Sequence, residues 1–177
     1  MDEARVGLIP TYRAIWAKRG QRPVAPSRRR YEWRYDYAFV HPGSGNMVHF
    51  VCSSVDTDLM SAVLKGFADQ LGLGAERHVV LVLDGAGWHR SKDLHVPAGL
   101  HLVILPPYSP ELQPVECLFP LINEALANRS FDDIEDLGRV LTGRIGELME
   151  DPLLVSDCTR FHWWPDDVKP VSNRLAS

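Results

Sequence analysis

Apolar positions along the chain follow two different periods, and the change between them predicts where strands and helices lie. Residues 1–9 read as the back half of a strand. Alternating apolar residues over 35–40 and 47–51, on either side of a turn at 41–46, predict a hairpin. Apolar residues four apart then predict an amphipathic helix over 59–71, which Thr57 or Asp58 caps and Gly72 ends.

The second half of the chain continues this alternation. The continuous apolar run Val79–Leu83 predicts a central strand buried on both faces, with a similar strand over 101–105. Pro114 suits the first position of a helix that reaches about residue 126, and a last helix is predicted over 132–149. A hairpin followed by helices and further strands predicts an α/β fold with a mixed sheet and helices packed on it.

The length of 177 residues predicts one domain. We expect this domain over 1–149, and a C-terminal tail over 150–177 packed on or trailing from it. The longest apolar runs are too short to cross a membrane. The three cysteines are odd in number and form no CxxC pair, which favours a reducing cytoplasm over a disulfide framework or a zinc site.

Charge is distributed unevenly along the chain. Residues 1–34 carry nine basic and three acidic groups, a net charge of +6, whereas the other 143 residues carry a net charge of −10. This asymmetry raises the expectation that a polyanion contacts the basic segment, although a solvated basic loop would have the same composition.

Carboxylates stand at three places where they could converge. Asp2 and Glu3 lie on the first strand, Asp84 closes the most hydrophobic strand, and Glu116 is the third residue of a helix that starts at Pro114. A few carboxylates together with water and substrate phosphate are what Mg²⁺ binds. Spacing alone also permits the plainer interpretation that Asp84 ends a strand and Glu116 helps to cap a helix.

Two segments separate these interpretations. Leu83-Asp84-Gly85-Ala86-Gly87-Trp88-His89-Arg90-Ser91-Lys92 is followed by Leu105-Pro106-Pro107-Tyr108-Ser109-Pro110-Glu111-Leu112-Gln113-Pro114-Val115-Glu116, and 31 residues separate Asp84 from Glu116. Together they resemble the DDE catalytic core of bacterial insertion-sequence transposases in the mariner superfamily. The opening Asp2-Glu3-Ala4-Arg5-Val6-Gly7 resembles the segment that carries the first acid of that core. The resemblance extends from residue 2 to about 145.

The resemblance implies a fold, an activity and a site. It implies the RNase H-like fold, a mixed five-stranded sheet whose first strand is truncated at its start. It implies that Asp2, Asp84 and Glu116 are the catalytic triad and bind two Mg²⁺ ions, for which Mn²⁺ substitutes. The activity implied is cleavage of a DNA strand and its transfer to target DNA by a homodimer, in the bacterial cytoplasm on the nucleoid.

The chain departs from the family pattern at several positions. Gln113 replaces the usual Asn, and Gln is a poor N-cap. Pro120 falls inside the expected catalytic helix and predicts a kink just after Glu116, at a cost of about 3 kcal/mol if nothing compensates. Basic residues are also missing from this helix, and the expected helix-turn-helix domains do not precede Met1. We therefore expect a truncated reading frame, the second frame of a split gene or a deliberately shortened chain. Pro120 leaves two interpretations open, a tolerated local kink or a decayed copy of a transposase.

Further residues are candidates for contact with DNA. Arg28, Arg29 and Arg30 are interleaved with aromatic residues, a mixture suited to phosphate contact and base stacking. The alternative for them is an edge strand protected by charge. Trp88, His89 and Lys92 follow Asp84 on its exit loop and would face the same DNA, although Trp88 also suits half-buried packing and the other two suit a solvated loop.

Three functions remain open from the sequence. The first is a metal-dependent strand-transfer domain, and the second is an inactive fragment that binds DNA or dimerises. The third is a nuclease that only hydrolyses. A Ser–His–Asp hydrolase is disfavoured because the chain lacks the GxSxG turn that presents such a nucleophile.

Overall fold

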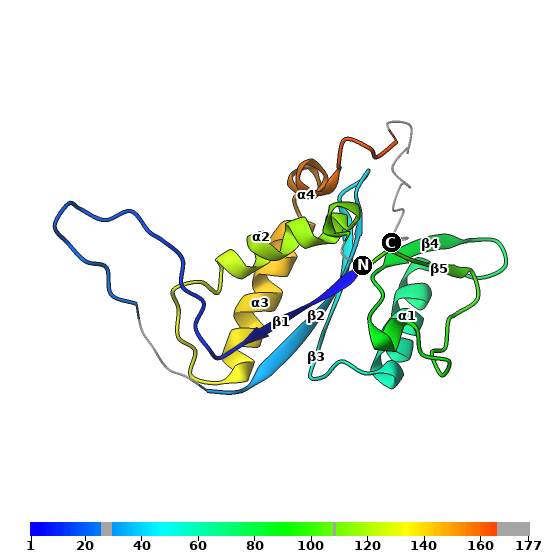
Figure 1. The fold of residues 1–177 in the computed structure, drawn as a ribbon, viewed down its shortest axis with the longest axis horizontal. Helices are drawn as coiled ribbons and strands as arrows, with labels where there is room; N and C mark the ends of the chain where they lie inside the picture. The colour runs from blue at the N-terminus through cyan, green and yellow to red at the C-terminus, as the bar shows by residue number, and fades with distance from the viewer. Residues whose placement is uncertain (26–29, 108, 166–177) are drawn as a thin grey trace.

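The computed structural model describes residues 1–25, 30–107 and 109–165, which form a mixed α/β fold. Within these residues there are five strands and four α-helices (Figure 1). Their order is β1 (Asp2–Gly7), β2 (Trp33–His41), β3 (Asn46–Cys52), α1 (Thr57–Leu71), β4 (Val79–Leu83), β5 (Leu100–Ile104), α2 (Leu118–Glu124), α3 (Ile134–Met149) and α4 (Pro152–Thr159). Short 3₁₀ turns η1 (Gly87–His89), η2 (Pro110–Leu112) and η3 (Pro114–Cys117) lie in the connections.

The strands form two ladders rather than the one five-stranded sheet expected. β1, β2 and β3 pair antiparallel in that order, and β4 pairs with β5 in parallel. The two ladders meet where the Met1 nitrogen donates a hydrogen bond of 2.7 Å to the Val82 carbonyl. Since β1 begins at Asp2, this bond alone is too little for a continuous ladder between β1 and β4.

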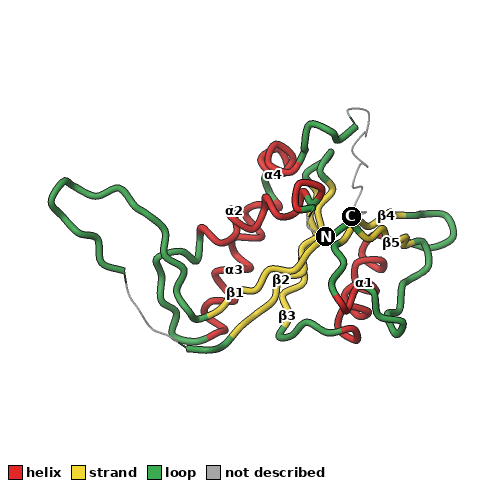
Figure 2. The backbone as a smooth tube through the Cα atoms, viewed as in Figure 1, coloured by secondary structure: helices red, strands yellow, loops and turns green. Residues whose placement is uncertain are grey.

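The β1–β2–β3 sheet is covered on both faces, with α2 and α3 on one side and α1 on the other (Figures 1 and 2). The first core packs Ala38 and Met47 of the sheet against Leu118, Leu137 and Leu141. The second packs the opposite sheet face against α1 and the β4–β5 pair, with Tyr37, Phe39, Met60, Leu64 and Leu83 buried. Successive side chains of a strand alternate between these two cores.

Side-chain caps set the starts of the two long helices. Asp56 accepts a hydrogen bond from the Leu59 N–H and caps α1, in place of the expected Thr57 or Asp58. Asp133 caps α3 in the same way through the Asp136 N–H. Gly72 ends α1 with φ of 63°, a left-handed conformation that glycine adopts at little cost.

One expectation about packing was wrong. β4 is not buried on both faces, because Val80 is 64% exposed, and Val103 on the same face of β5 is 46% exposed. The segment after residue 149 begins with α4, whose Val155 is fully buried in the first core. No helix in the described ranges is long and apolar enough to cross a membrane.

The helix expected from Pro114 is interrupted just after Glu116, where Pro120 predicted a kink. The segment from Pro114 first forms the η3 turn, and α2 begins only at Leu118. Pro120 is thus the third residue of α2, in a first turn whose N–H groups have no partner within the helix. The break between the 3₁₀ turn and the α-helix therefore avoids the cost of a proline in a helix interior.

Candidate functional site

Asp84 and Glu116 line the same hollow, at the end of the sheet where β4 and β5 stop. Asp84 follows β4 directly, and its side chain is 50% exposed. Glu116 is exposed on η3. The hollow is also lined by Gly85, Ala86, Arg90, Leu105, Pro106, Pro107, Ser109 and Gln113. The two acids, which have 31 residues between them in the sequence, therefore line one space.

Gln113 fixes η3 against the first strand. Its amide nitrogen donates to the Met1 carbonyl at 3.3 Å, and the side chain is buried. Gln113 makes no capping hydrogen bond to η3, in agreement with the expectation that Gln is a poor N-cap. Its longer side chain instead ties the turn that carries Glu116 to the strand that carries Asp2.

Asp2 belongs to the same end of the sheet, on the neighbouring strand. The pKa of Asp2 is raised to about 6, mainly by burial and also by the negative charges of Glu3 and Asp84, against a lowering hydrogen bond from the Glu3 N–H. Asp2 pairs with Ala38, which belongs to the α2–α3 core, and so faces the side of the sheet where η3 lies. Glu3 faces the opposite side.

His89 lies buried between two carboxylates. Its Nδ1 is 2.7 Å from Oδ1 of Asp84, and its Nε2 is 2.9 Å from Oε1 of Glu3. The His89 side chain is 0% exposed and that of Glu3 is 6% exposed. Burial by itself lowers the pKa of His89, but the hydrogen bonds and charges of Glu3 and Asp84 outweigh it and raise the pKa above its ordinary value.

The predicted DNA contacts after Asp84 separate into two groups. His89 is buried, and Trp88 packs on the second core with its indole N–H 3.4 Å from Glu3. Both rings therefore contact Glu3 inside the protein. Lys92 is exposed on the same loop.

Two residues of the site were missed by sequence reasoning. Arg90 is exposed in the hollow, and a Cβ atom at Gly85 would lie only 2.6 Å from its Nη2, so the guanidinium lies against the Gly85 backbone. Glu3 was passed over in favour of Asp2. Arg90 could have been identified as a site residue because it lies close to Asp84 in the sequence. Nothing in the sequence marks Glu3 as a partner of His89.

The basic segment between β1 and β2 forms an arm that projects from the body of the molecule (Figure 1). Arg28 and Arg29 lie outside the described residues. Arg30 donates to the Asp132 carbonyl at 2.6 Å and pairs with Glu32. Lys18 and Trp16 are exposed farther along the arm, Trp16 completely.

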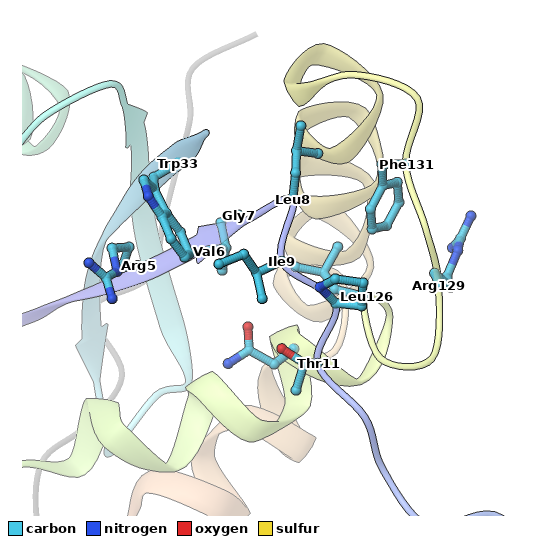
Figure 3. A pocket seen from close by; sticks show the side chains of 12 residues that line it. Arg5, Val6, Gly7, Leu8, Ile9, Thr11, Trp33, Leu126, Arg129 and Phe131 are labelled. Atoms are coloured by element: carbon cyan, nitrogen blue, oxygen red, sulfur yellow. The ribbon is translucent and has the colours of Figure 1, made fainter. Parts of the chain in front are cut away.

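A second hollow lies at the base of this arm (Figure 3). Residues from the end of β1 and the end of α2 line it, and Arg5 stacks 4.3 Å from the Trp33 ring beside it. The Asn128 side chain holds the arm here, because it accepts from the Arg13 N–H and donates to the Arg13 carbonyl, each at 3.0 Å. This hollow lies at the opposite end of β1 from Asp2.

The donor chemistry of the first hollow fits a divalent cation. Asp84 and Glu116 offer carboxylate oxygens to one space, which are the ligands that Mg²⁺ prefers. Asp2 is close enough to Asp84 for the two charges to interact. Within the described ranges, no three acidic, His or Cys side chains already stand together in a group that could hold a metal. A metal ion would therefore draw these carboxylates closer together.

Known proteins resemble this chain in sequence and in fold. Residues 1–138 match the family model described as DDE superfamily endonuclease. The chain is 33% identical over 132 residues to the uncharacterized protein y4pE/y4sA of Sinorhizobium fredii (strain NBRC 101917 / NGR234). The aligned region covers 74% of this chain and 96% of that protein.

Solved structures of the Mos1 mariner protein share the fold. A pre-cleavage Mos1 transpososome matches with a TM-score of 0.59 and 15% identity over 92% of this chain and 56% of that chain. The Mos1 strand transfer complex matches with a TM-score of 0.56 and 16% identity over 92% and 54%. Mos1 paired-end complexes with Mn and with Mg each match with a TM-score of 0.54. This chain thus spans about half the length of the Mos1 chains.

Proposed function

Because this chain belongs to the DDE superfamily endonuclease family, we propose that it is a transposase catalytic domain that cleaves a DNA strand and transfers it to target DNA. The observation that carries this proposal is the hollow that Asp84 and Glu116 both line, with Asp2 close enough to Asp84 for their charges to interact. Cleavage and transfer are each an in-line attack of an oxygen on phosphorus, so one site suffices for both.

Asp2, Asp84 and Glu116 are the residues that would hold the metal, as two Mg²⁺ ions or Mn²⁺ in their place. Bound there, two ions stabilise the attacking and leaving oxygens of the displacement. The Mos1 complexes with Mn and with Mg support this choice of ions. In this chain the carboxylates supply the ligands, and Gln113 keeps the Glu116 turn against the first strand.

DNA is the proposed partner, reached from two sides of the molecule. Arg90 and Lys92 offer positive charge at the hollow, where a phosphate near the carboxylates needs a compensating charge. The basic arm, including Arg28, Arg29 and Arg30, offers a second contact.

We propose that two copies of the chain assemble on DNA. We also propose residues 1–149 as the catalytic domain, with 150–177 as a segment that packs on it through α4.

The experiment compares two charge-neutral variants, Asp84→Asn and Glu116→Gln, with the wild-type chain. Each variant should lose Mn²⁺- and Mg²⁺-dependent nicking of an end-containing duplex, because each removes one charged ligand of the site. Glu111→Gln is the matched control, because Glu111 is an exposed carboxylate on η2 outside the residues that line the hollow. Wild-type nicking activity in Asp84→Asn would refute the proposal.

Two further measurements separate the alternatives. A pre-cut end incubated with target DNA should give joined product, and a chain that nicks but never joins would be a nuclease that only hydrolyses. Mn²⁺ binding measured by titration calorimetry distinguishes an active site from an inactive fragment. A folded wild-type chain that neither binds Mn²⁺ nor nicks DNA would be the inactive fragment that binds DNA or dimerises.

A further inference from the structure

The carboxylate–histidine–carboxylate chain from Glu3 through His89 to Asp84 has no part in the chemistry described so far. His89 makes close polar contacts at both ring nitrogens, 2.7 Å to Asp84 and 2.9 Å to Glu3. The two contacts, one at each ring nitrogen, hold the imidazole in a single orientation between the strand of Glu3 and the loop of Asp84. The ring is fully buried and therefore reaches neither DNA nor solvent.

The hydrogen bonds described for the Asp84 side chain all end on one of its two oxygens. Oδ1 accepts from His89 Nδ1 and from the Ala86 N–H at 3.0 Å. The side chain is nevertheless half exposed and lines the hollow. Two donors on Oδ1 fix the rotation of the carboxylate and leave Oδ2 for a ligand in the hollow.

Glu3 anchors the other end of the chain. It lies on β1, next to Asp2 but on the opposite face, and is almost completely buried. The β1 and β4 ladders share few backbone contacts, the Met1-to-Val82 hydrogen bond being the one described between them. The Glu3–His89–Asp84 chain therefore adds a side-chain link between the strand of Asp2 and the exit loop of Asp84.

We propose that His89 is a positioning residue that, held by Glu3, binds Oδ1 of Asp84 and presents Oδ2 to the divalent metal. This inference rests on the proposed metal-dependent function and adds a role for two residues that touch neither metal nor DNA. Hydrogen-bond partners of metal ligands fix ligand orientation, and their loss typically weakens metal binding by about 10- to 100-fold.

Two amides that mimic the two ring nitrogens test the inference. In His89→Asn, the side-chain amide can take the position of Nδ1 and keep the hydrogen bond to Asp84. In His89→Gln, the side-chain amide can take the position of Nε2 and keep only the hydrogen bond to Glu3. We expect Mn²⁺ affinity, measured by titration calorimetry on the full chain without DNA, to fall about 10- to 100-fold in His89→Gln and much less in His89→Asn. Nicking at saturating Mn²⁺ should show the same order.

The outcomes separate this inference from the proposed function. An equal loss of Mn²⁺ affinity in the two variants would mean that the ring has a merely structural role. An unchanged Mn²⁺ affinity in both variants would mean that the ring has no role. Either result, in a protein whose wild type binds Mn²⁺, overturns the inference. A wild-type chain that does not bind Mn²⁺ overturns the proposed function and the inference with it. If His89→Gln does not fold, Glu3→Leu serves instead, because it removes the oxygen acceptor for His89 Nε2. A Mn²⁺ affinity of Glu3→Leu identical to wild type would contradict the anchoring role of Glu3.

Discussion

Two carboxylate–histidine clusters are buried in this molecule, and they end differently. In one, His89 joins Glu3 to an Asp84 side chain that is half exposed. In the other, His49 of β3 and Asp36 of β2 are 4% and 1% exposed, and Nδ1 of His49 is 2.9 and 3.0 Å from the two oxygens of Asp36. The Nε2 atom of His49 is buried and has no hydrogen-bond partner among the described residues.

The difference lies in what remains free on each carboxylate. Both oxygens of Asp36 face His49 inside the sheet, on the side that packs against α2 and α3, so a ligand cannot reach them. Asp84 uses one oxygen inward and lies in an open hollow. The same pair of groups is therefore structural in one place and a candidate for metal binding in the other, and burial alone does not distinguish them.

The largest expected effect comes from breaking the closed pair. Asp36→Ala leaves the His49 ring buried without its partner, and we expect the free energy of unfolding to fall by about 3 kcal/mol. For a chain of this length that is a fall in Tm of roughly 6–12 °C. Asp84→Asn should change the Tm of the metal-free protein much less, because the amide oxygen can still accept from His89 Nδ1 while repulsion with Asp2 is relieved. Thermal unfolding followed by circular dichroism in EDTA measures both.

The control replaces the whole pair. Asp36→Val with His49→Leu removes both polar side chains and the unpartnered Nε2 together, and replacing a buried polar pair by apolar residues of similar size is often neutral or stabilising. The double variant should recover most of the stability lost in Asp36→Ala. A Tm of Asp36→Ala equal to that of the wild type would remove the distinction between the two clusters. A fall in Tm that is as large in Asp84→Asn as in Asp36→Ala would remove it too.

Regular elements with strong periodic patterns were predictable from the sequence. The strand over 79–83 and the helix that Gly72 ends lie where the apolar pattern put them. α4 was missed because its apolar residues do not repeat along one face, although Asp151 as N-cap and Pro152 at the first position were available signals. The exposed face of β4 was missed because a continuous apolar run does not show which side is covered.

The site was predictable in part, for a physical reason. Asp84 and Glu116 stand at ends of elements, and such positions can be inferred from where a strand stops and a turn starts. The inward partners could not be inferred, because Glu3 and His89 are 86 residues apart and meet only through the packing of β1 against the Asp84 loop. For the same reason the Asp36–His49 pair, on adjacent strands, depended on a register that the sequence did not specify.

A smaller effect sharpens the comparison at the open cluster. Burial raises the folded-state pKa of Asp2 to about 6 from an ordinary 3.8, so the folded protein holds the Asp2 proton more tightly than the unfolded chain. Ionisation of Asp2 therefore lowers stability, and this loss develops as pH rises from about 4 to about 6 and persists above it. Asp2→Asn replaces the titrating carboxyl group by a neutral amide, so it avoids this loss of stability. The variant should raise the Tm of the metal-free protein by a few degrees at pH 7.5.

The control for this effect is pH itself. Well below pH 4 wild-type Asp2 is protonated in both states, so the difference in Tm between wild type and Asp2→Asn should shrink towards zero. Excess Mg²⁺ at pH 7.5 should also narrow the difference, because only the wild type gains a metal-bound carboxylate. A Tm difference that is constant from pH 4 to pH 7.5 would mean that the crowding of Asp2 with Asp84 and Glu3 does not affect stability.

The smallest expected effect concerns DNA, where the acidic hollow contrasts with the basic arm. Binding to duplex DNA should be weak, at about 10⁻⁴–10⁻⁶ M at physiological salt, and insensitive to sequence. Replacing Arg28, Arg29 and Arg30 with Ala should weaken it equally for all sequences. The same replacement should flatten the dependence of binding on salt, by about 0.9 in slope for each phosphate that the protein no longer neutralises.

Arg30 should contribute the smaller part of this change. Its guanidinium already donates to the Asp132 carbonyl and pairs with Glu32, so it has less free charge to offer a phosphate, and Arg30→Ala alone is the variant that isolates its share. Fluorescence anisotropy on two unrelated duplexes over a salt series measures these slopes. Tight binding to one duplex only would contradict this account. An unchanged slope in the triple variant would instead assign the DNA path to the Arg90 and Lys92 side of the molecule, because those two side chains carry the positive charge beside the hollow.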